Sequence, residues 1–120
     1  MDDQDVAAVE AAAADYIEGW YGGDTARMDR ALHDDLVKRI IVVDEETGEA
    51  GFRVVTKARM VEMTASGGGE QVDPEFEVFV DGISGDIAAA RTVSPEYVDY
   101  LHLTRTPDGW KIANVLFRMR

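Results

Sequence analysis

A carboxylic acid stands in the middle of an apolar pattern near the C-terminal end of the chain. Asp99 lies among Val98, Leu101 and Leu103, in a segment that is expected to form a central strand of a sheet. A carboxyl group in such a place must be paired with a donor, held protonated or used in function. Asp99 is therefore the first candidate for chemistry.

Two histidines are further candidates for acid–base chemistry, because imidazole titrates near neutrality. His33 is expected at the end of a short helix, where its ring would also suit the unpaired carbonyl groups. His102 is three positions from Asp99, so a regular strand directs the two side chains to opposite faces. This spacing disfavours a His102–Asp99 dyad and leaves His33 as either a catalyst or a helix cap.

A polar residue, Asn114, also interrupts the last apolar segment, and its direction depends on the closing hairpin. If residues 106–109 form a four-residue loop, Asn114 faces the same side as Asp99, whereas a three-residue loop turns it away. Both alternatives remain open in the sequence.

Other kinds of site have little support. Asp34 and Asp35 are adjacent acids with no further ligand at metal-binding spacing, so we expect no metal. The glycine run at 67–69 follows a predicted helix and lacks the Lys-Ser/Thr of a phosphate loop. No serine or cysteine stands in a recognisable nucleophile motif, and we expect no cofactor.

Composition limits the partners. The chain has 120 residues, which suits one domain over 1–120, and a net charge of −12 with scattered basic residues. Such a chain is not expected to bind nucleic acid or an anionic membrane. The lack of cysteines and of a long apolar run favours a cytoplasmic location.

Three helices are expected in the first half. Apolar side chains recur every three or four positions over residues 6–20, before the Gly22–Gly23 pair that ends the helix. Asp24 is expected to cap a short helix that ends near residues 33–35. Thr56 is expected to cap a third, which the glycines at 67–69 terminate.

Strands are expected before and after the third helix. β-Branched segments at 36–43 and 52–55 predict a hairpin, and three or four long antiparallel strands are expected in a meander over 76–83, 87–93, 97–105 and 110–119. Pro95 cannot donate to a ladder, which predicts a bulge or bend in the sheet. The order of elements predicts an α+β fold.

Two stretches resemble the nuclear transport factor 2-like (NTF2-like) superfamily, with its SnoaL-like, ketosteroid isomerase-like and lumazine-binding-like members. They are YIEGWYGGDTARMDRALHDDLV at 16–37 and YVDYLHLTRTPDGWKIANVLF at 97–117, and the lumazine-binding-like group is the most similar. The resemblance implies a cystatin-like cone, with three N-terminal helices packed in a strongly curved, mixed, mostly antiparallel sheet. It also implies a pocket for a small molecule.

The resemblance also suggests roles for particular residues. Asp99 matches the ketosteroid isomerase aspartic acid that stays neutral and donates a hydrogen bond to a developing oxyanion, and Tyr16 matches its companion donor. The place of the general base falls at Ile40, so ketosteroid isomerase activity is not expected. The alternative role for Tyr16 and Asp99 is a buried hydrogen bond that satisfies two core groups.

Two functions follow as hypotheses. The first is binding of an apolar or aromatic molecule without turnover, and the second is a SnoaL-like lyase, isomerase or hydratase acting on a carbonyl compound. In the second, Tyr16 and Asp99 donate hydrogen bonds and His33 is a possible base. The candidate ligand-binding residues, several of which could equally be ordinary core, are Tyr16, Trp20, Ile40, Met60, Met63, Asp99 and Asn114.

The outer face of the sheet is expected to join two chains. Tyr100, His102, Val115 and Phe117 would form an apolar patch if they shared one face. We therefore expect a homodimer through the convex side of the sheet.

Overall fold

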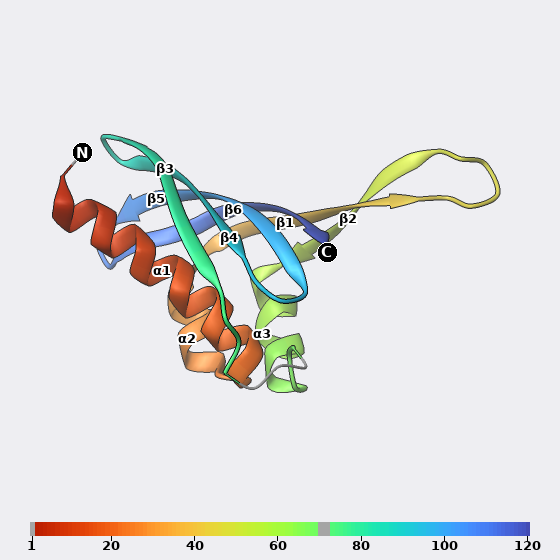
Figure 1. The fold of residues 1–120 in the computed structure, drawn as a ribbon, viewed down its shortest axis with the longest axis horizontal. Helices are drawn as coiled ribbons and strands as arrows, with labels where there is room; N and C mark the ends of the chain where they lie inside the picture. Colours follow the sequence, from red (N-terminus) through yellow and green to blue (C-terminus); the bar gives the residue numbers. More distant parts are fainter. Residues whose placement is uncertain (1, 70–72) are drawn as a thin grey trace.

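The computed structural model describes residues 2–69 and 73–120, in which three helices lie on one face of a six-stranded sheet (Figure 1). In chain order the elements are α1 (Asp3–Gly22), α2 (Thr25–Ala31), β1 (Leu32–Val43), β2 (Ala50–Thr56), α3 (Lys57–Ala65), β3 (Glu77–Ser84), β4 (Ile87–Val93), β5 (Tyr97–Thr106) and β6 (Gly109–Met119). None of the helices in the described residues is both long and apolar enough to cross a membrane.

The sheet has the order β2-β1-β6-β5-β4-β3. β1 runs parallel to β6, and every other neighbouring pair is antiparallel. The parallel pair joins the first strand in the sequence to the last, so the first helices are brought against the C-terminal strands. The predicted α+β class and its mixed, mostly antiparallel curled sheet are confirmed.

The helix starts agree with their predicted caps. The side chain of Asp24 accepts a hydrogen bond from the Arg27 amide at 3.1 Å, and that of Thr56 accepts one from the Arg59 amide at 3.3 Å. α1 ends at Gly22 and is capped by Gly23, whose φ of 64° lies in the left-handed region that favours glycine. These caps fix where α1 ends and where α2 and α3 begin.

The predicted end of the second helix was wrong. α2 ends at Ala31, and β1 begins at Leu32, so His33, Asp34 and Asp35 belong to a strand. Leu32 is buried and extended, and it pairs with Ile112 of β6. This pairing joins residues far apart in the sequence, so the local helical pattern could not predict it.

Of the two distortions predicted at Pro95, the bend is present and the bulge is not, and the bend lies between two strands and not within one. Pro95 lies in the connection between β4 and β5, where the Ser94 amide donates to the Tyr97 carbonyl at 2.9 Å. A proline in a turn costs the ladder no hydrogen bond, so no bulge is needed there.

One bulge lies in β6 instead. His102 pairs with Asn114, but Leu103 pairs with Ile112, so Ala113 is an extra residue in the strand. As a result Ile112 and Val115 are both buried on the helix side, although they are three positions apart.

The glycine run after α3 packs on the end of α1. The amide of Gly69 donates to the Trp20 carbonyl at 3.2 Å. Gly68 has a φ of +53°, and a Cβ atom there would overlap the carbonyl oxygen of Trp20. The run therefore ends α3 as predicted and holds Trp20 close to the C-terminal end of that helix.

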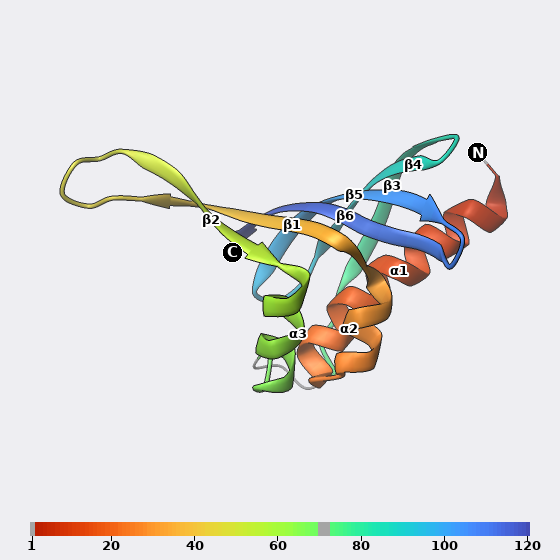
Figure 2. The same ribbon diagram turned by 180° about the vertical axis from the view of Figure 1, so that it is seen from behind.

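The hairpin of β1 and β2 extends beyond the rest of the sheet (Figure 2). Its apolar side chains are exposed, with Ile41, Phe52 and Val54 each more than half accessible. The base of the hairpin, around Ile40 and Arg53, lies over α3 and closes one side of the cavity described next.

Candidate functional site

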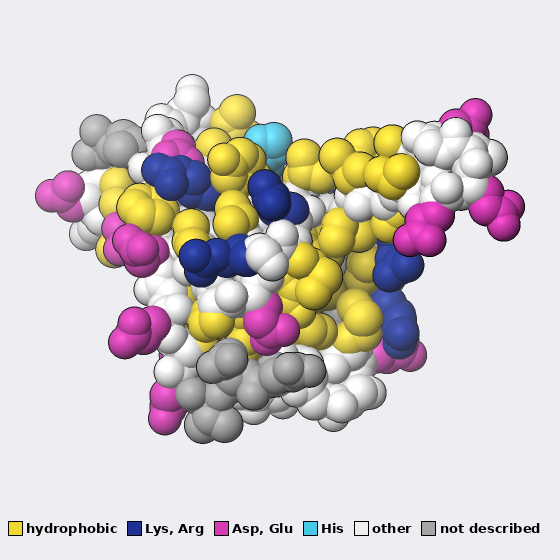
Figure 3. Space-filling view, turned by 45° about the vertical axis from the view of Figure 1, so that its right-hand side comes forward, with side chains coloured by type: hydrophobic (Ala, Val, Ile, Leu, Met, Phe, Trp, Pro, Cys, Tyr) yellow, Lys and Arg dark blue, Asp and Glu magenta, His cyan; other side chains and the backbone are white. Residues whose placement is uncertain are grey.

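A cavity of about 230 Å³ lies between the inner face of the sheet and helices α1 and α3. Its lining is mainly aromatic and aliphatic, with a small set of polar groups. The space-filling view in Figure 3 shows hydrophobic side chains gathered below the projecting hairpin, with Lys and Arg side chains on both sides of them. The lining residues are Tyr16, Ile17, Trp20, Lys38, Ile40, Arg53, Val55, Met60, Met63, Tyr97, Asp99, Phe117 and Met119.

A buried hydrogen bond joins α1 to β5 in this cavity. The hydroxyl of Tyr16 donates to Oδ1 of Asp99 at 2.8 Å, and both residues are almost fully buried, at 2% and 1% exposure. α1 presents Tyr16 on the same face as Ile17 and Ala13, which pack in the core. In this arrangement Asp99 is the acceptor and Tyr16 the donor.

Lys38 extends this interaction into a chain of three groups. Its Nζ atom donates to the Tyr16 hydroxyl oxygen at 2.6 Å. Nζ also lies 4.3 Å from the centre of the Phe117 ring, 5.1 Å from that of Tyr16 and 5.9 Å from that of Trp20. Three aromatic rings therefore surround a cationic group, an arrangement that stabilises its charge.

Burial shifts the pKa values of Tyr16, Lys38 and Asp99. It raises the pKa of Tyr16 well above its usual value, an effect to which the Asp99 charge adds, so the hydroxyl stays protonated at neutral pH. Burial lowers the pKa of Lys38, against the opposing effect of the Asp99 charge. It also raises the pKa of Asp99, although the Lys38 charge and the Tyr16 hydrogen bond oppose that rise.

A second cationic residue lines the cavity at its edge. Arg53 of β2 pairs with Ile40 of β1, and both line the cavity. The Arg53 residue is exposed, and among the described residues its side chain has no carboxylate or hydrogen-bonding partner. The cavity thus combines apolar walls with two cationic side chains and one carboxyl group.

Comparison with protein families assigns the chain to one of them. A family model described as "Putative lumazine-binding" matches residues 4–118. The chain belongs to this family. Among solved structures, an NTF2-like protein of unknown function from Silicibacter pomeroyi is 19% identical with a TM-score of 0.80, and the match covers 100% of both chains.

Other solved structures agree on the NTF2-like fold. A ketosteroid isomerase-like protein from Erwinia carotovora atroseptica is 19% identical with a TM-score of 0.68, covering 98% of each chain. A domain of unknown function with a cystatin-like fold from Nostoc punctiforme is 15% identical with a TM-score of 0.67, covering 100% of this chain and 80% of that one. A search of curated proteins finds no match. At these identities the likeness shows the NTF2-like fold and no more.

Six of the candidate residues line the cavity of this NTF2-like fold. Met60 is fully buried on α3, while Trp20, Ile40 and Met63 are partly accessible. These four join Tyr16 and Asp99 in one lining. Whether a ligand contacts them stays a prediction.

The structure does not bring His33 to this cavity. As the second residue of β1, it accepts a hydrogen bond from the Asp35 amide at 3.0 Å through Nδ1. It lines a polar groove on another part of the surface, with Asp34 and Lys57. No group of three potential metal ligands gathers around it or elsewhere within residues 2–69 and 73–120. The expectation that His33 acts as the base in this cavity is therefore not supported.

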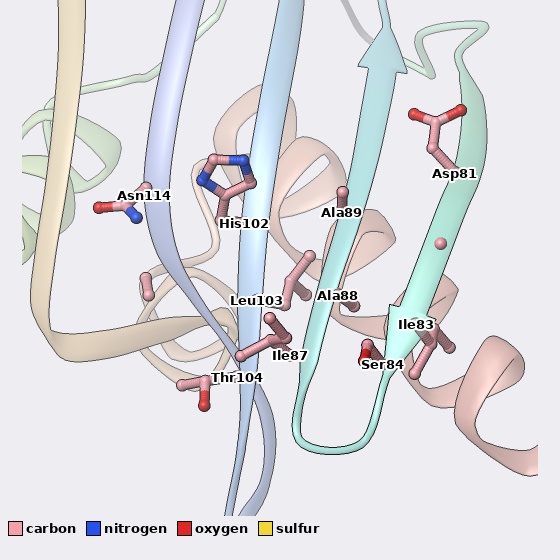
Figure 4. Close-up of a pocket in the computed structure, with 12 residues that line it drawn as sticks. Asp81, Ile83, Ser84, Ile87, Ala88, Ala89, His102, Leu103, Thr104 and Asn114 are labelled. Carbon is pink, nitrogen blue, oxygen red and sulfur yellow. The ribbon is translucent and has the colours of Figure 1, made fainter.

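Asn114 faces away from the cavity. Residues 107 and 108 join β5 to β6, with Thr106 paired to Gly109 and Arg105 to Trp110. This is the register expected for the loop over 106–109, which alone would place Asn114 on the same side as Asp99. The bulge at Ala113 reverses that direction and pairs Asn114 with His102. Figure 4 shows both side chains on the face of the sheet that points away from the helices. The assignment of Asn114 to the ligand site was wrong for this reason.

The same bulge divides the predicted outer patch. Tyr100 and His102 lie on the outer face, but Val115 is buried and Phe117 lines the cavity. Leu116 takes the outer position beside Tyr100, with which it pairs. An apolar outer face exists, but with different members.

Sequence reasoning missed Lys38, although a signal was present. Lys38 lies two positions before Ile40 in a predicted strand, so both must point to the same face. Since Ile40 was assigned to the cavity, Lys38 belonged there too. Arg53 lacked such a signal, because its place depends on the register between β1 and β2.

Proposed function

We propose that this chain binds a compact aromatic molecule in the cavity between the sheet, α1 and α3. The observation that carries the proposal is the combination of apolar walls with a hydrogen-bonded group of Lys38, Tyr16 and Asp99. Binding sites for small molecules typically combine such walls with a few convergent polar groups.

The size of the cavity supports a small ligand. An apolar cavity of about 150 Å³ is enough to hold benzene. The volume of about 230 Å³ therefore suits one ring with a polar substituent, or two small fused rings. Trp20 and Phe117 offer aromatic surface, and Met60 and Met63 can adapt to the outline of the ligand.

A second candidate is an enzyme of the lyase, isomerase or hydratase kind that acts on a carbonyl compound. Lys38 is the observation in its favour, because an amine with a lowered pKa can accept a proton where Ile40 cannot. In this reading Lys38 takes the role of base, and Tyr16 and Asp99 polarise the carbonyl group. An NMR titration that found Asp99 ionised with an ordinary pKa would contradict its role as a donor.

A thermal-shift screen tests the binding function. A ligand that binds only the folded chain raises its unfolding midpoint, so compact aromatic compounds are expected to raise it and aliphatic compounds of equal volume are not. Trp20→Ala should weaken the response by opening one wall of the cavity, whereas Tyr100→Ala on the outer face should leave it unchanged. Absence of any response across a broad aromatic panel would contradict the proposal.

We also propose that the outer face of the sheet joins two copies of the chain. Ile41, Phe52, Val54, Tyr100 and Leu116 are each about half exposed or more, and together they form an apolar surface on neighbouring strands. Leu116→Glu should then separate the copies. Light scattering that gave 13.2 kDa for the unaltered chain at micromolar concentration would refute the dimer.

A further inference from the structure

Half of the basic side chains of this acidic chain form ion pairs, and the two that line the cavity do not. Acids outnumber bases by 24 to 12. Six basic residues form ion pairs with carboxylates, namely Arg27, Arg30, Lys57, Arg59, Arg91 and Arg105. Six others have no such contact among the described residues, and two of these six, Lys38 and Arg53, line the cavity. Two cations directed to one cavity in a chain of net charge −12 suggest an anionic ligand.

Lys38 has unused donors. Its ammonium group has three N–H bonds, and one is directed to the Tyr16 hydroxyl. The remaining close neighbours are aromatic rings, which stabilise positive charge but are weak hydrogen-bond acceptors. A cationic group enclosed by protein needs acceptors for its donors, because unsatisfied donors are costly there. Within the described residues no other side chain supplies one.

The charges facing the cavity sum to a positive value. Lys38 comes from β1, Arg53 from β2 and Asp99 from β5, while Tyr16 and Tyr97 carry no charge. Asp99 is already engaged by Tyr16 on its Oδ1 atom, and that hydroxyl stands between its carboxyl group and Lys38. In the cavity lining two cationic side chains therefore accompany one carboxyl group, which Tyr16 already engages.

We infer that the cavity binds a compact aromatic acid as its anion, with the carboxylate on Lys38 Nζ and the ring between Trp20 and Phe117. Arg53 supplies a second contact at the cavity edge. This inference rests on the proposed binding function and names its ligand class. A carboxylate is favoured over a phosphate ester, because the smaller planar group occupies less of the small apolar volume.

Isothermal titration with matched probes tests the inference. Benzoate and 1-naphthoate are the anionic probes, and benzamide and benzyl alcohol are neutral probes of similar shape. Lys38→Met should weaken benzoate or naphthoate binding roughly 10- to 100-fold, which corresponds to loss of a charge-assisted hydrogen bond. Binding of the neutral probes should change much less. Lys38→Arg, which keeps the charge, should retain part of the anion affinity.

Arg39→Met is the matched control. Arg39 is the next residue on β1 and also has no ion pair within residues 2–69 and 73–120, but it pairs with Val54 and Leu116 and faces outward. Its removal changes the net charge by the same amount. If Arg39→Met weakened anion binding as much as Lys38→Met did, the effect would be one of overall charge, and the inference would be overturned. The unfolding midpoint of each variant shows that it is folded.

The probes separate two failures. Neutral probes that bind while the anions do not would leave the binding function intact and refute the choice of an anion. Failure of both kinds of probe would refute the compact aromatic ligand itself. Anion binding that was lost in Lys38→Met but kept in Arg39→Met would support both the binding function and the choice of an anionic ligand.

Discussion

The two faces of one sheet reverse the usual distribution of side chains at neighbouring positions. On β1, Lys38 faces the cavity and Arg39 faces outward, and on β5 the buried Asp99 is followed by Tyr100, which is 61% exposed. A sheet with one solvated face normally places apolar residues inside and polar ones outside. Buried charges and exposed apolar surface both carry a cost, so stability does not explain either. This difference is the basis of the two proposals, a ligand on the inner face and a second copy of the chain on the outer one.

Among the substitutions that test this difference between the faces, removal of the Asp99 carboxyl group is expected to change the free energy of unfolding most. Asp99→Ala leaves the Tyr16 hydroxyl without its acceptor and Lys38 without a nearby negative charge. We expect a loss of about 2–4 kcal/mol in the free energy of unfolding, as for other broken buried interactions. Urea unfolding measures it, with Arg39→Met as the outward-facing control. An equal loss in the two variants would remove the distinction between the faces.

Lys38→Met is expected to raise the free energy of unfolding, in contrast to Asp99→Ala. It replaces a cation that burial destabilises with an apolar side chain suited to the surrounding rings. Replacing buried charge in this way can stabilise a protein by ~1–2 kcal/mol. The gain should grow as the pH falls through the raised pKa of Asp99, because a protonated Asp99 needs no positive neighbour. A clear loss of stability at every pH tested would show that Lys38 is a structural requirement.

The raised pKa of Asp99 gives stability a predictable pH dependence. Between the usual aspartate pKa and the raised value, the folded chain binds more protons than the unfolded one, so the unfolding free energy falls as pH rises. Asp99→Asn should remove this slope. Asp5, Asp15 and Asp34 have lowered pKa values, so they make the unfolding free energy rise with pH. This rise is the same in the unaltered chain and in Asp99→Asn, so it cancels when the two curves are subtracted. Parallel curves for the two proteins from pH 4 to pH 8 would contradict the assignment.

His33→Ala is expected to have the smallest effect. His33 lies outside the cavity lining, and its hydrogen bond joins two residues of the same strand. Aromatic ligand affinity should therefore change less than about twofold, as for surface substitutions elsewhere. A larger change in ligand affinity, measured by isothermal titration, would show that His33 contributes to ligand binding.

Local patterns in the sequence predicted the parts of the fold that local interactions determine. The spacing of apolar residues in α1 and the caps at Asp24 and Thr56 predicted the helices, because caps and amphipathic faces involve residues a few positions apart. The β1–β6 pairing joins opposite ends of the chain, which is why the end of α2 was misplaced. Long-range register is decided by the packing of the whole sheet.

The candidate site shows the same division. Tyr16 and Asp99 were paired through resemblance, and they form a hydrogen bond. Lys38 could have been found from alternation along its strand, but Asn114 was misplaced because a bulge changes the direction of every later residue. Its position depends on the fit of two strands, and no residue type in the segment marks it.

The extra residue at Ala113 determines which side chains of β6 face the cavity and which face outward. The end of β6 beyond it is one position out of phase with the beginning, and this phase directs Phe117 to the cavity and Leu116 to the outer face. Deletion of Ala113 would leave the same pairs in a regular ladder, whereas loss of the bulge with the length unchanged would exchange those two environments. A relative of the same length with a regular β6 would therefore direct the residue at 116 to the cavity and the residue at 117 to the outer face.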